Sequence, residues 1–344
     1  MKSQTAVTSS CDASTSLSIE SFTSVGNQRG HVLRRISSAK TVAILLCTYQ
    51  GQRFLREQLD SIATQSYQNW TVWASDDGSV DGTREILEQY SQKWGPDRLV
   101  LDRGPSEGFV ANFLTLACKT TVNADFYAFA DQDDIWESDK LSKALATLLK
   151  VPEGVAGLYC GRTRLVDEQN REIGYSPLFR RKPSFNNALV QSIAGGNTMV
   201  FNAATRSLLL QAEAGVEVAS HDWWAYLLVS GCGGTVFYDA RPTIRYRQHD
   251  DNLVGSNGEW SARLMRIRWL LKGRFRIWSD QHVAALQKVR DRMTPENKYV
   301  FDFFTNSRQK WLLPRLIGLK KCKLYRQTFF GNIGLCVAAI MNKI

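Results

Sequence analysis

The chain has 344 residues, 44% of them hydrophobic, so it is long enough to bury a large core. Its seven cysteines are scattered, with no C-x-x-C pair or metal-ligand spacing, which disfavours a disulfide scaffold and favours a reduced, cytoplasmic chain. The first 40 residues contain 14 Ser or Thr and no apolar leader, which predicts a disordered tail over 1–39 and no signal peptide.

The net charge of +10 is unevenly distributed along the chain. Residues 260–344 contain 18 Lys or Arg against 4 Asp or Glu, a net charge of +14, which leaves −4 for residues 1–259. A mildly acidic body with a basic C-terminal segment indicates a polyanionic partner, either an anionic membrane surface or nucleic acid.

From residue 41 onward, short apolar runs alternate with segments of helical periodicity. The predicted strands are 42–46, 70–74, 99–101, 126–130 and 158–160, and the predicted helices lie near 55–62, 86–90, 108–118 and 138–149, the last with Ser138 as its N-cap. This alternation predicts a parallel, doubly wound α/β sheet, in which ligands bind beyond the carboxyl ends of the strands.

An acidic cluster follows the buried run 126–130. Because side chains alternate along extended backbone, Asp131 and Asp133 can point the same way, and two carboxylates so close repel unless a proton or a cation intervenes. Mg²⁺ and Mn²⁺ sites are typically built from one or two carboxylates, substrate phosphates and water. The cluster therefore predicts a divalent cation, the alternative being a helix N-cap with solvated acids.

Polar residues also follow the other predicted strands. Thr48-Tyr49-Gln50-Gly51 ends the first, and Ser75-Asp76-Asp77-Gly78-Ser79 ends the second, although this composition also suits a simple turn. Neither G-x-G-x-x-G after the first strand nor G-x-x-x-x-G-K-[ST] occurs, which disfavours a dinucleotide-binding Rossmann enzyme and a P-loop nucleotidase.

Seven pieces of the sequence, in order, carry a resemblance to a known family. They are Thr48-Tyr49-Gln50-Gly51, Ser75 to Ser79 with Asp81-Gly82-Thr83, Gly108 with Asn112, Asp131 to Trp136, Gly195-Gly196-Asn197, His221-Asp222-Trp223 and Tyr246-Arg247-Gln248-His249. Across roughly residues 41–255 the chain resembles family-2 inverting glycosyltransferases with the GT-A fold, and bacterial rhamnosyltransferase-like members in particular. The resemblance implies a doubly wound mixed sheet flanked by helices.

The resemblance also implies roles for individual residues. Asp222 would be the catalytic base, and Asp133 and His249 would ligate Mg²⁺ or Mn²⁺. The nucleotide-sugar donor would be bound by Thr48, Tyr49, Asp77, Asn112 and Asp131, and the acceptor by Gly195, Gly196 and Trp223. One carboxylate base suffices to activate an acceptor hydroxyl in a single displacement.

Structural alternatives stay open for several of these residues. His249 could be an ordinary hydrogen-bonded histidine, Asp222 a helix N-cap, and Asn112 a solvent-facing helix residue. Gly195 and Gly196 could form a hairpin turn, where glycine also allows a ligand to approach the backbone closely.

Apolar residues at helical spacing alternate with basic ones beyond residue 260. Leu264, Ile267, Leu271, Phe275 and Trp278 are interleaved with arginine and lysine, which is typical of a helix that lies on a membrane surface. One alternative is that these helices pack on the catalytic domain. The other, contact with nucleic acid, is the one we disfavour most. We therefore expect a glycosyltransferase domain at 40–257 and a basic, helical, membrane-associating segment at 258–344.

The predicted activity is transfer of a sugar, rhamnose or a related hexose, from a dTDP- or UDP-sugar to a hydroxyl of a growing, lipid-linked surface glycan. The predicted location is cytoplasmic, peripherally bound to the inner face of the membrane. One rival is a sugar nucleotidyltransferase, disfavoured because the first strand lacks a Gly-rich, Arg-containing phosphate loop. The other is a non-catalytic glycan- or membrane-binding protein with a degenerate site.

Overall fold

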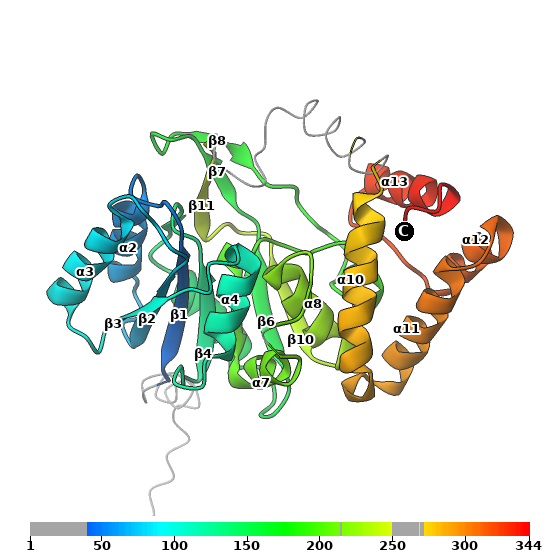
Figure 1. Cartoon of the computed structure of the whole chain (residues 1–344), viewed down its shortest axis with the longest axis horizontal. Helices are drawn as coiled ribbons and strands as arrows, with labels where there is room; N and C mark the ends of the chain where they lie inside the picture. The colour runs from blue at the N-terminus through cyan, green and yellow to red at the C-terminus, as the bar shows by residue number, and fades with distance from the viewer. Residues whose placement is uncertain (1–39, 214, 250–267, 269–271) are drawn as a thin grey trace, which may run out of the picture. The chain divides into compact units, whose positions relative to one another are not determined.

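A seven-stranded mixed β-sheet lies at the centre of the computed structural model, which describes residues 40–213, 215–249, 268 and 272–344 (Figure 1). In spatial order its strands are β10 (Thr235–Asp239), β6 (Gly157–Gly161), β9 (Val200–Asn202), β4 (Phe126–Ala130), β1 (Val42–Thr48), β2 (Trp70–Asp76) and β3 (Leu99–Arg103). The α/β prediction is confirmed, with one correction to the parallel arrangement. Strand β9 runs antiparallel to both β4 and β6, so the sheet is mixed.

Helices cover both faces of this sheet, because its central strands are apolar on both sides. In β1, Ile44 and Leu46 pack with one apolar cluster, and Leu45 and Cys47 pack with the other. The first cluster includes side chains from α2 (Leu55–Ala63), α3 (Thr83–Trp94) and α5 (Lys140–Leu148). The second includes side chains from α4 (Phe109–Cys118), α6 (Phe185–Ala188), α7 (Ala203–Gln211) and α8 (His221–Gly231).

The start of α5 differs from the prediction. The N-cap position is occupied by Asp139 rather than Ser138, and its side chain makes no capping hydrogen bond. The backbone carbonyl of Ser138 instead accepts a hydrogen bond from the backbone N–H of Ser66, 2.7 Å away. Ser138 therefore joins two loops rather than capping the helix.

A second, four-stranded sheet lies beyond the acidic cluster. Its strands, in order, are β5 (Ile135–Trp136), β11 (Ile244–Arg247), β7 (Arg164–Val166) and β8 (Glu172–Tyr175). Strand β5 directly follows Asp134 and pairs antiparallel with β11. This pairing places Arg247 and the residues after it beside the acidic cluster.

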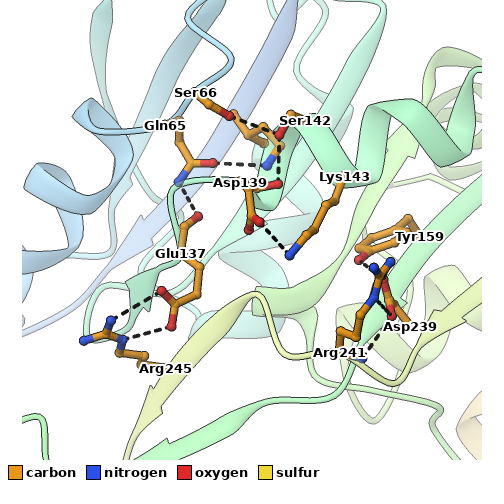
Figure 2. A network of polar contacts seen from close by, with 11 residues as sticks. Gln65, Ser66, Glu137, Asp139, Ser142, Lys143, Tyr159, Asp239, Arg241 and Arg245 are labelled. Carbon is orange, nitrogen blue, oxygen red and sulfur yellow. Dashed lines mark hydrogen bonds and ion pairs between the residues drawn. The ribbon is translucent and has the colours of Figure 1, made fainter.

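Polar contacts hold the segment between β5 and α5 in place (Figure 2). The side-chain amide of Gln65 donates to the carbonyl of Glu137 at 2.8 Å, and its oxygen accepts from the backbone N–H of Leu141 at 3.1 Å. The Arg245 guanidinium of β11 donates to both carboxylate oxygens of Glu137, at 3.0 and 3.3 Å. The chain that leaves the acidic cluster is thus tied to the turn that follows α2 and to β11.

The C-terminal segment is helical, as expected. Its helices are α10 (Arg274–Lys288), α11 (Pro295–Arg308), α12 (Leu312–Lys321) and α13 (Phe329–Ile340), and α10 lies beside α8 in Figure 1. Leu286, Phe301 and Phe304 are buried in the same apolar cluster as one face of the sheet. The amide of Asn297 also donates to the carbonyls of Ser230 and Gly231 at the end of α8.

Part of the C-terminal prediction cannot be compared with the structure. Trp260, Leu264, Ile267 and Leu271 lie outside the described residues, as does the Ser/Thr-rich segment 1–39. Among the helices that are described, none combines the length and the apolar character needed to cross a membrane.

The burial of α11 predicts a large effect of a core substitution there. Phe301→Ala should lower the free energy of unfolding by about 3–5 kcal/mol, the usual cost of removing a buried phenylalanine. Tyr299→Ala, on the same helix but 69% exposed, is the matched control and should change it by less than about 0.5 kcal/mol. Chemical denaturation measures the free energy of unfolding of both variants. If Phe301→Ala lowers it no more than Tyr299→Ala does, α11 is outside the cooperatively folded unit.

Candidate functional site

The carboxyl ends of β1, β2 and β4 meet at one edge of the sheet. Thr48 is paired in register with Asp76, and Leu46 with Ala130, so the residues after each strand emerge side by side. Asp77 and Asp131 therefore emerge from the two strands that flank β1, at the same edge of the sheet, as the sequence predicted from the parallel arrangement.

Asp77 is buried and holds the loop that follows β3. Its two carboxylate oxygens accept hydrogen bonds from the backbone N–H groups of Ser106, at 2.7 Å, and Gly108, at 2.8 Å. Gly104 lies so close that a Cβ there would be 2.6 Å from Asp77 Oδ1. Asp77 is thus more than a turn residue, because it organises the wall of the site from which it projects.

Thr48 and Tyr49 occupy different environments at the end of β1. The Thr48 hydroxyl is buried and donates to Asp76 at 2.9 Å, whereas the Tyr49 side chain is 57% exposed. The side chain of Gln132 bonds the backbone of Tyr49 twice, accepting from its N–H and donating to its carbonyl, both at 2.8 Å. Gln132 thereby joins the acidic cluster to β1, a contact that no sequence pattern indicated.

Asn112 is a buried residue of α4 and does not face solvent, so that alternative was wrong. Its amide donates to the Ser75 carbonyl at 3.0 Å, and its oxygen accepts from the Ser75 hydroxyl at 2.6 Å. This pair of bonds attaches α4 to the end of β2. The contacts seen here position the site, and a direct contact of Asn112 with the donor stays a prediction.

The acidic cluster is strongly perturbed electrostatically. Burial, with the negative charges of Asp133 and Asp222 close by, raises the pKa of Asp131 to about 8. The pKa of Asp134 is also raised well above its usual range by burial and by its neighbours Asp133 and Asp131. The cluster does not cap a helix, because the chain continues into β5. Four carboxylates, from the β4 end and from α8, therefore act on one another.

Asp134 links the cluster to the Gly-rich turn. Its Oδ2 accepts a hydrogen bond from the Asn197 amide at 2.5 Å, while its Oδ1 has no hydrogen-bond partner within the described residues. The Lys140 ammonium is equally buried, lies 3.6 Å from the centre of the Trp136 ring, and has its pKa lowered to about 7 by burial. Asp134 and Asn197 are thus a direct connection between the predicted donor and acceptor sides.

Asp133 and His249, the two predicted metal ligands, lie together. Asp133 Oδ2 is 2.8 Å from His249 Nε2. The Arg247 guanidinium, fully buried, donates to the Asp133 carbonyl at 3.1 Å, to the Glu168 carbonyl at 2.6 Å and to the Glu57 carboxylate at 2.7 Å. Arg247 belonged to a recognised motif, but nothing in the sequence indicated that it would be the buried centre of this loop.

The first turn of α8 supplies the remaining carboxylate. Asp222 is the second residue of the helix rather than its N-cap, which is Ser220. One of its oxygens accepts from the backbone N–H of Trp223 at 2.6 Å and contacts the Ser220 hydroxyl. Since the charge of Asp222 raises the pKa of Asp131, the fold brings the predicted base to the acidic cluster.

His221 faces away from the solvent and packs among aromatic rings. It stacks on Phe113 with 4.0 Å between ring centres and meets Phe129 edge-on at 4.7 Å. Burial lowers the pKa of His221 to about 4, and neither ring nitrogen has a hydrogen-bond partner in the part of the chain that the structure describes. His221 is therefore neutral at physiological pH and acts in packing.

Gly195 and Gly196 form a short 3-10 turn, η1 (Gly196–Thr198), rather than a hairpin. A Cβ at Gly196 would lie 2.2 Å from Nε2 of His221. The His221 ring thus fills the space beside Gly196 that a side chain would need. We had expected glycine here to let a ligand approach the backbone, so the structure gives a different reason for it. Contact of these glycines with an acceptor stays a prediction.

Trp223 connects α8 to the C-terminal helices. Its indole N–H donates to the Ala188 carbonyl at 2.6 Å, and its ring packs against His282 and Trp278 of α10, with centres 4.5 and 6.2 Å apart. The residue beside the predicted base is therefore held by the segment that the sequence assigned to membrane association.

The side chains at this edge fit a divalent cation that is shared with a substrate. Within the described residues, no group of three His, Cys, Asp or Glu side chains is arranged to hold a metal ion alone. Asp133 and His249 offer two ligands, beside a cluster in which burial and the neighbouring carboxylates raise the pKa of Asp131. Two protein ligands, completed by phosphate oxygens and water, are the usual arrangement for Mg²⁺ and Mn²⁺ bound with a nucleotide.

The contact between Gly196 and His221 generates a test of this geometry. Gly196→Ala should destabilise the protein by about 1–3 kcal/mol, because the added methyl overlaps a buried ring that has no room to move. In a protein that already carries His221→Ala, the same Gly196→Ala substitution should cost much less, because the ring that the methyl overlaps is gone. Gly334→Ala, where nothing lies within 4 Å, is the control and should be neutral or slightly stabilising. Additive losses in the double variant would contradict the packing described here.

Comparisons with known proteins agree with this arrangement. The family described as glycosyl transferase family 2 matches residues 43–209, which include β1, β4 and the acidic cluster. The dTDP-rhamnosyl transferase RfbG of Shigella flexneri is 28% identical over 245 residues, covering 66% of this chain and 81% of RfbG. The Escherichia coli UDP-Glc:alpha-D-GlcNAc-diphosphoundecaprenol beta-1,3-glucosyltransferase WfgD is 29% identical over 109 residues, 32% of this chain and 41% of WfgD.

Among solved structures, GalNAc-T7 with UDP, GalNAc and Mn²⁺ has a TM-score of 0.51 and 9% identity, covering 85% of this chain and 56% of GalNAc-T7. At that identity the likeness concerns the fold, and with the mixed sheet it confirms the GT-A-type architecture. The family match and the similarity to RfbG support a glycosyltransferase rather than a nucleotidyltransferase or a non-catalytic binding protein. Residues 43–209 therefore form a glycosyltransferase family 2 domain, and the chain is rhamnosyltransferase-like.

Proposed function

We propose that the protein is a metal-dependent, inverting glycosyltransferase that moves rhamnose or a related hexose from a dTDP- or UDP-sugar to a hydroxyl of a lipid-linked glycan. The observation that carries the proposal is the grouping of Asp131, Asp133 and Asp222 with His249, next to Asp77 at the same sheet edge. RfbG, by its name, uses a dTDP-rhamnosyl donor, and WfgD, by its name, acts on a diphosphoundecaprenol-linked sugar.

The donor side of the site would be formed by the ends of β1 and β2. Asp77 is already fixed by two backbone N–H groups, and each of its oxygens keeps a lone pair that can accept from a base N–H. The half-exposed Tyr49 ring would cover the base, and Asp131 would face the ribose or the donor sugar. These assignments explain why a buried carboxylate is kept at the end of β2.

Asp133 and His249 would hold Mg²⁺ or Mn²⁺, which, when bound, supplies positive charge opposite the diphosphate leaving group. Arg247 keeps the loop that carries Asp133 closed against β11 and α2. Asp133 would then be correctly placed before the donor binds, so little reorganisation would be needed during the reaction.

Asp222 would remove the proton from the acceptor hydroxyl. It stands in the first turn of α8, where the helix dipole stabilises its negative charge. Trp223, adjacent to it and anchored on α10, would form one side of the acceptor subsite, with Gly195 and Gly196 opposite. Since a single base is used, the displacement would invert the anomeric centre.

Loss of one metal ligand should abolish most of the activity without unfolding the protein. Asp133→Asn should lower turnover by about 100-fold or more, because loss of even an outer partner of a metal site costs about 10- to 100-fold. The melting temperature should not fall, since the substitution relieves repulsion. Asp139→Asn changes an acid beyond β5 that pairs with Lys143; it is the control and should keep full activity. Near wild-type turnover of Asp133→Asn with Mn²⁺ present would refute the metal site.

The base should affect the chemical step rather than donor binding. Asp222→Asn should reduce the transfer rate by about 10²- to 10⁴-fold, the usual contribution of a general base, with donor affinity unchanged. Titration calorimetry with the nucleotide-sugar and a single-turnover transfer assay separate the two quantities. If donor affinity falls in parallel with the rate, Asp222 has a structural or binding role instead.

A further inference from the structure

The outer sides of α12 and α13 expose large apolar side chains to solvent. Phe329 and Phe330 are each 75% exposed, Trp311 is 67% exposed, and Leu313 and Ile317 are each 56% exposed. The two helices are neighbours, with the Arg315 guanidinium of α12 reaching the Ile340 carbonyl of α13 at 3.5 Å. Several large apolar side chains exposed on two neighbouring helices often mark an interaction site. We call this surface the α12–α13 face.

The spacing shows that the exposed residues of each helix share a side. Leu313 and Ile317 are four residues apart on α12, as are Phe329 and Ile333 on α13. Residues four apart project from the same face of a helix. The opposite sides pack inward, since Leu319 and Ala339 belong to the main apolar cluster. Each helix therefore has one side that packs inward and an opposite, solvent-exposed side that is also apolar.

Basic residues flank α12 and α13 in the sequence. Residues 303–344 contain eight Lys or Arg and no Asp or Glu, and α13 itself contains no charged residue. Lys320, Lys321 and Lys323 are exposed at the end of α12 and just after it. Apolar anchors bordered by basic side chains are the pattern that binds anionic lipid headgroups together with the acyl boundary.

The positive charge of the C-terminal helices also helps to decide which partner binds the α12–α13 face. In a symmetric contact with a second copy, this basic surface would face itself, and like charges would repel. Residues 1–39 carry four basic and two acidic side chains, so they offer no compensating charge either. We propose that the α12–α13 face docks on the surface of a bilayer that contains anionic lipid, with Phe329, Phe330 and Trp311 entering the headgroup region.

The dimensions indicate that the helices lie in the plane of the bilayer. Helix α13 has 12 residues, about 18 Å at 1.5 Å per residue, against about 30 Å of hydrocarbon. The attachment is therefore peripheral. The buried helices α10 and α11 join this face to Trp223 beside Asp222, so the catalytic site would be held at the membrane. A lipid-linked acceptor would then be reached by diffusion in two dimensions.

Vesicle co-sedimentation of the full chain tests the proposal. Vesicles of phosphatidylcholine with phosphatidylglycerol should bind the protein, vesicles of phosphatidylcholine alone should bind far less, and 1 M salt should weaken binding because it shortens the screening length to about 3 Å. Lys320→Glu with Lys321→Glu should weaken binding at least about 25-fold, about fivefold per lysine. Phe329→Ser with Phe330→Ser should weaken it about tenfold or more.

Matched variants separate position from overall charge. Lys93→Glu with Lys150→Glu makes the same charge change at exposed sites outside the C-terminal helices, and Tyr299→Ser removes an exposed aromatic ring from α11. Both should bind vesicles like the wild type, and all variants should keep the wild-type melting temperature, since each altered side chain is exposed.

Three outcomes would overturn the proposal: equal binding to neutral and anionic vesicles, no binding to either, or equal losses in the two lysine variants. A dimer in light scattering that Phe329→Ser with Phe330→Ser dissociates, with vesicle binding unchanged, would assign the face to a second copy. The assay contains no nucleotide-sugar, so its result is independent of the proposed transfer activity.

Discussion

Repulsion between buried carboxylates is the constraint around which the site is built. Asp131, Asp133 and Asp134 follow β4, and Asp222 approaches them from α8, so the charges of four acidic side chains act on one another. Burial and mutual repulsion raise the pKa of Asp131 to about 8, so the charged form of this carboxyl group is disfavoured where it stands. An arrangement that costs stability persists where function uses it, and a divalent cation with a diphosphate is the partner that suits it.

The groups around the cluster hold it in shape. Gln132 binds it to the backbone after β1, Arg247 binds it to β11 and α2, and Asn197 binds it to the turn before β9. Each tie comes from a different part of the chain. A displacement of the acceptor-side turn would therefore act on the donor-side carboxylates through Asp134 and Asn197. The C-terminal helices extend the same connection, because α10 packs on Trp223 next to Asp222.

The sequence allowed a correct prediction where a structural feature depends on residues close together in the chain, and not where it depends on contacts between distant segments. The apolar runs that became β1, β2 and β4 are unambiguous, and their parallel alignment follows from the helices between them, so Asp77 and Asp131 were correctly brought to one edge. The two-residue strand β5 could not be foreseen, since it exists through pairing with β11, more than 100 residues away.

Other features could not be predicted because the same residue type can occur buried or exposed, and the sequence around it does not say which. Asn112 was a possible solvent-facing residue but is buried against Ser75, and Gly196 makes room for the His221 ring rather than for a ligand. Arg247 is fully buried, although arginine is normally exposed, because three oxygen acceptors from separate segments surround it. The positive charge of the C-terminal segment was evident, but not its division between core helices and the α12–α13 face.

Thermal melting with nucleotide-sugars tests the central claim most directly, because a ligand that binds the native state stabilises it by about 2.7 kcal/mol at 100 times its Kd. The protein should be melted with dTDP-rhamnose, UDP-glucose or GDP-mannose, each with Mn²⁺ and with a chelator. We expect a higher melting temperature with a dTDP- or UDP-sugar and Mn²⁺, and little change with the chelator or with GDP-mannose. A shift of the same size without metal, or none with any nucleotide-sugar, would contradict a cation-dependent donor site at the acidic cluster.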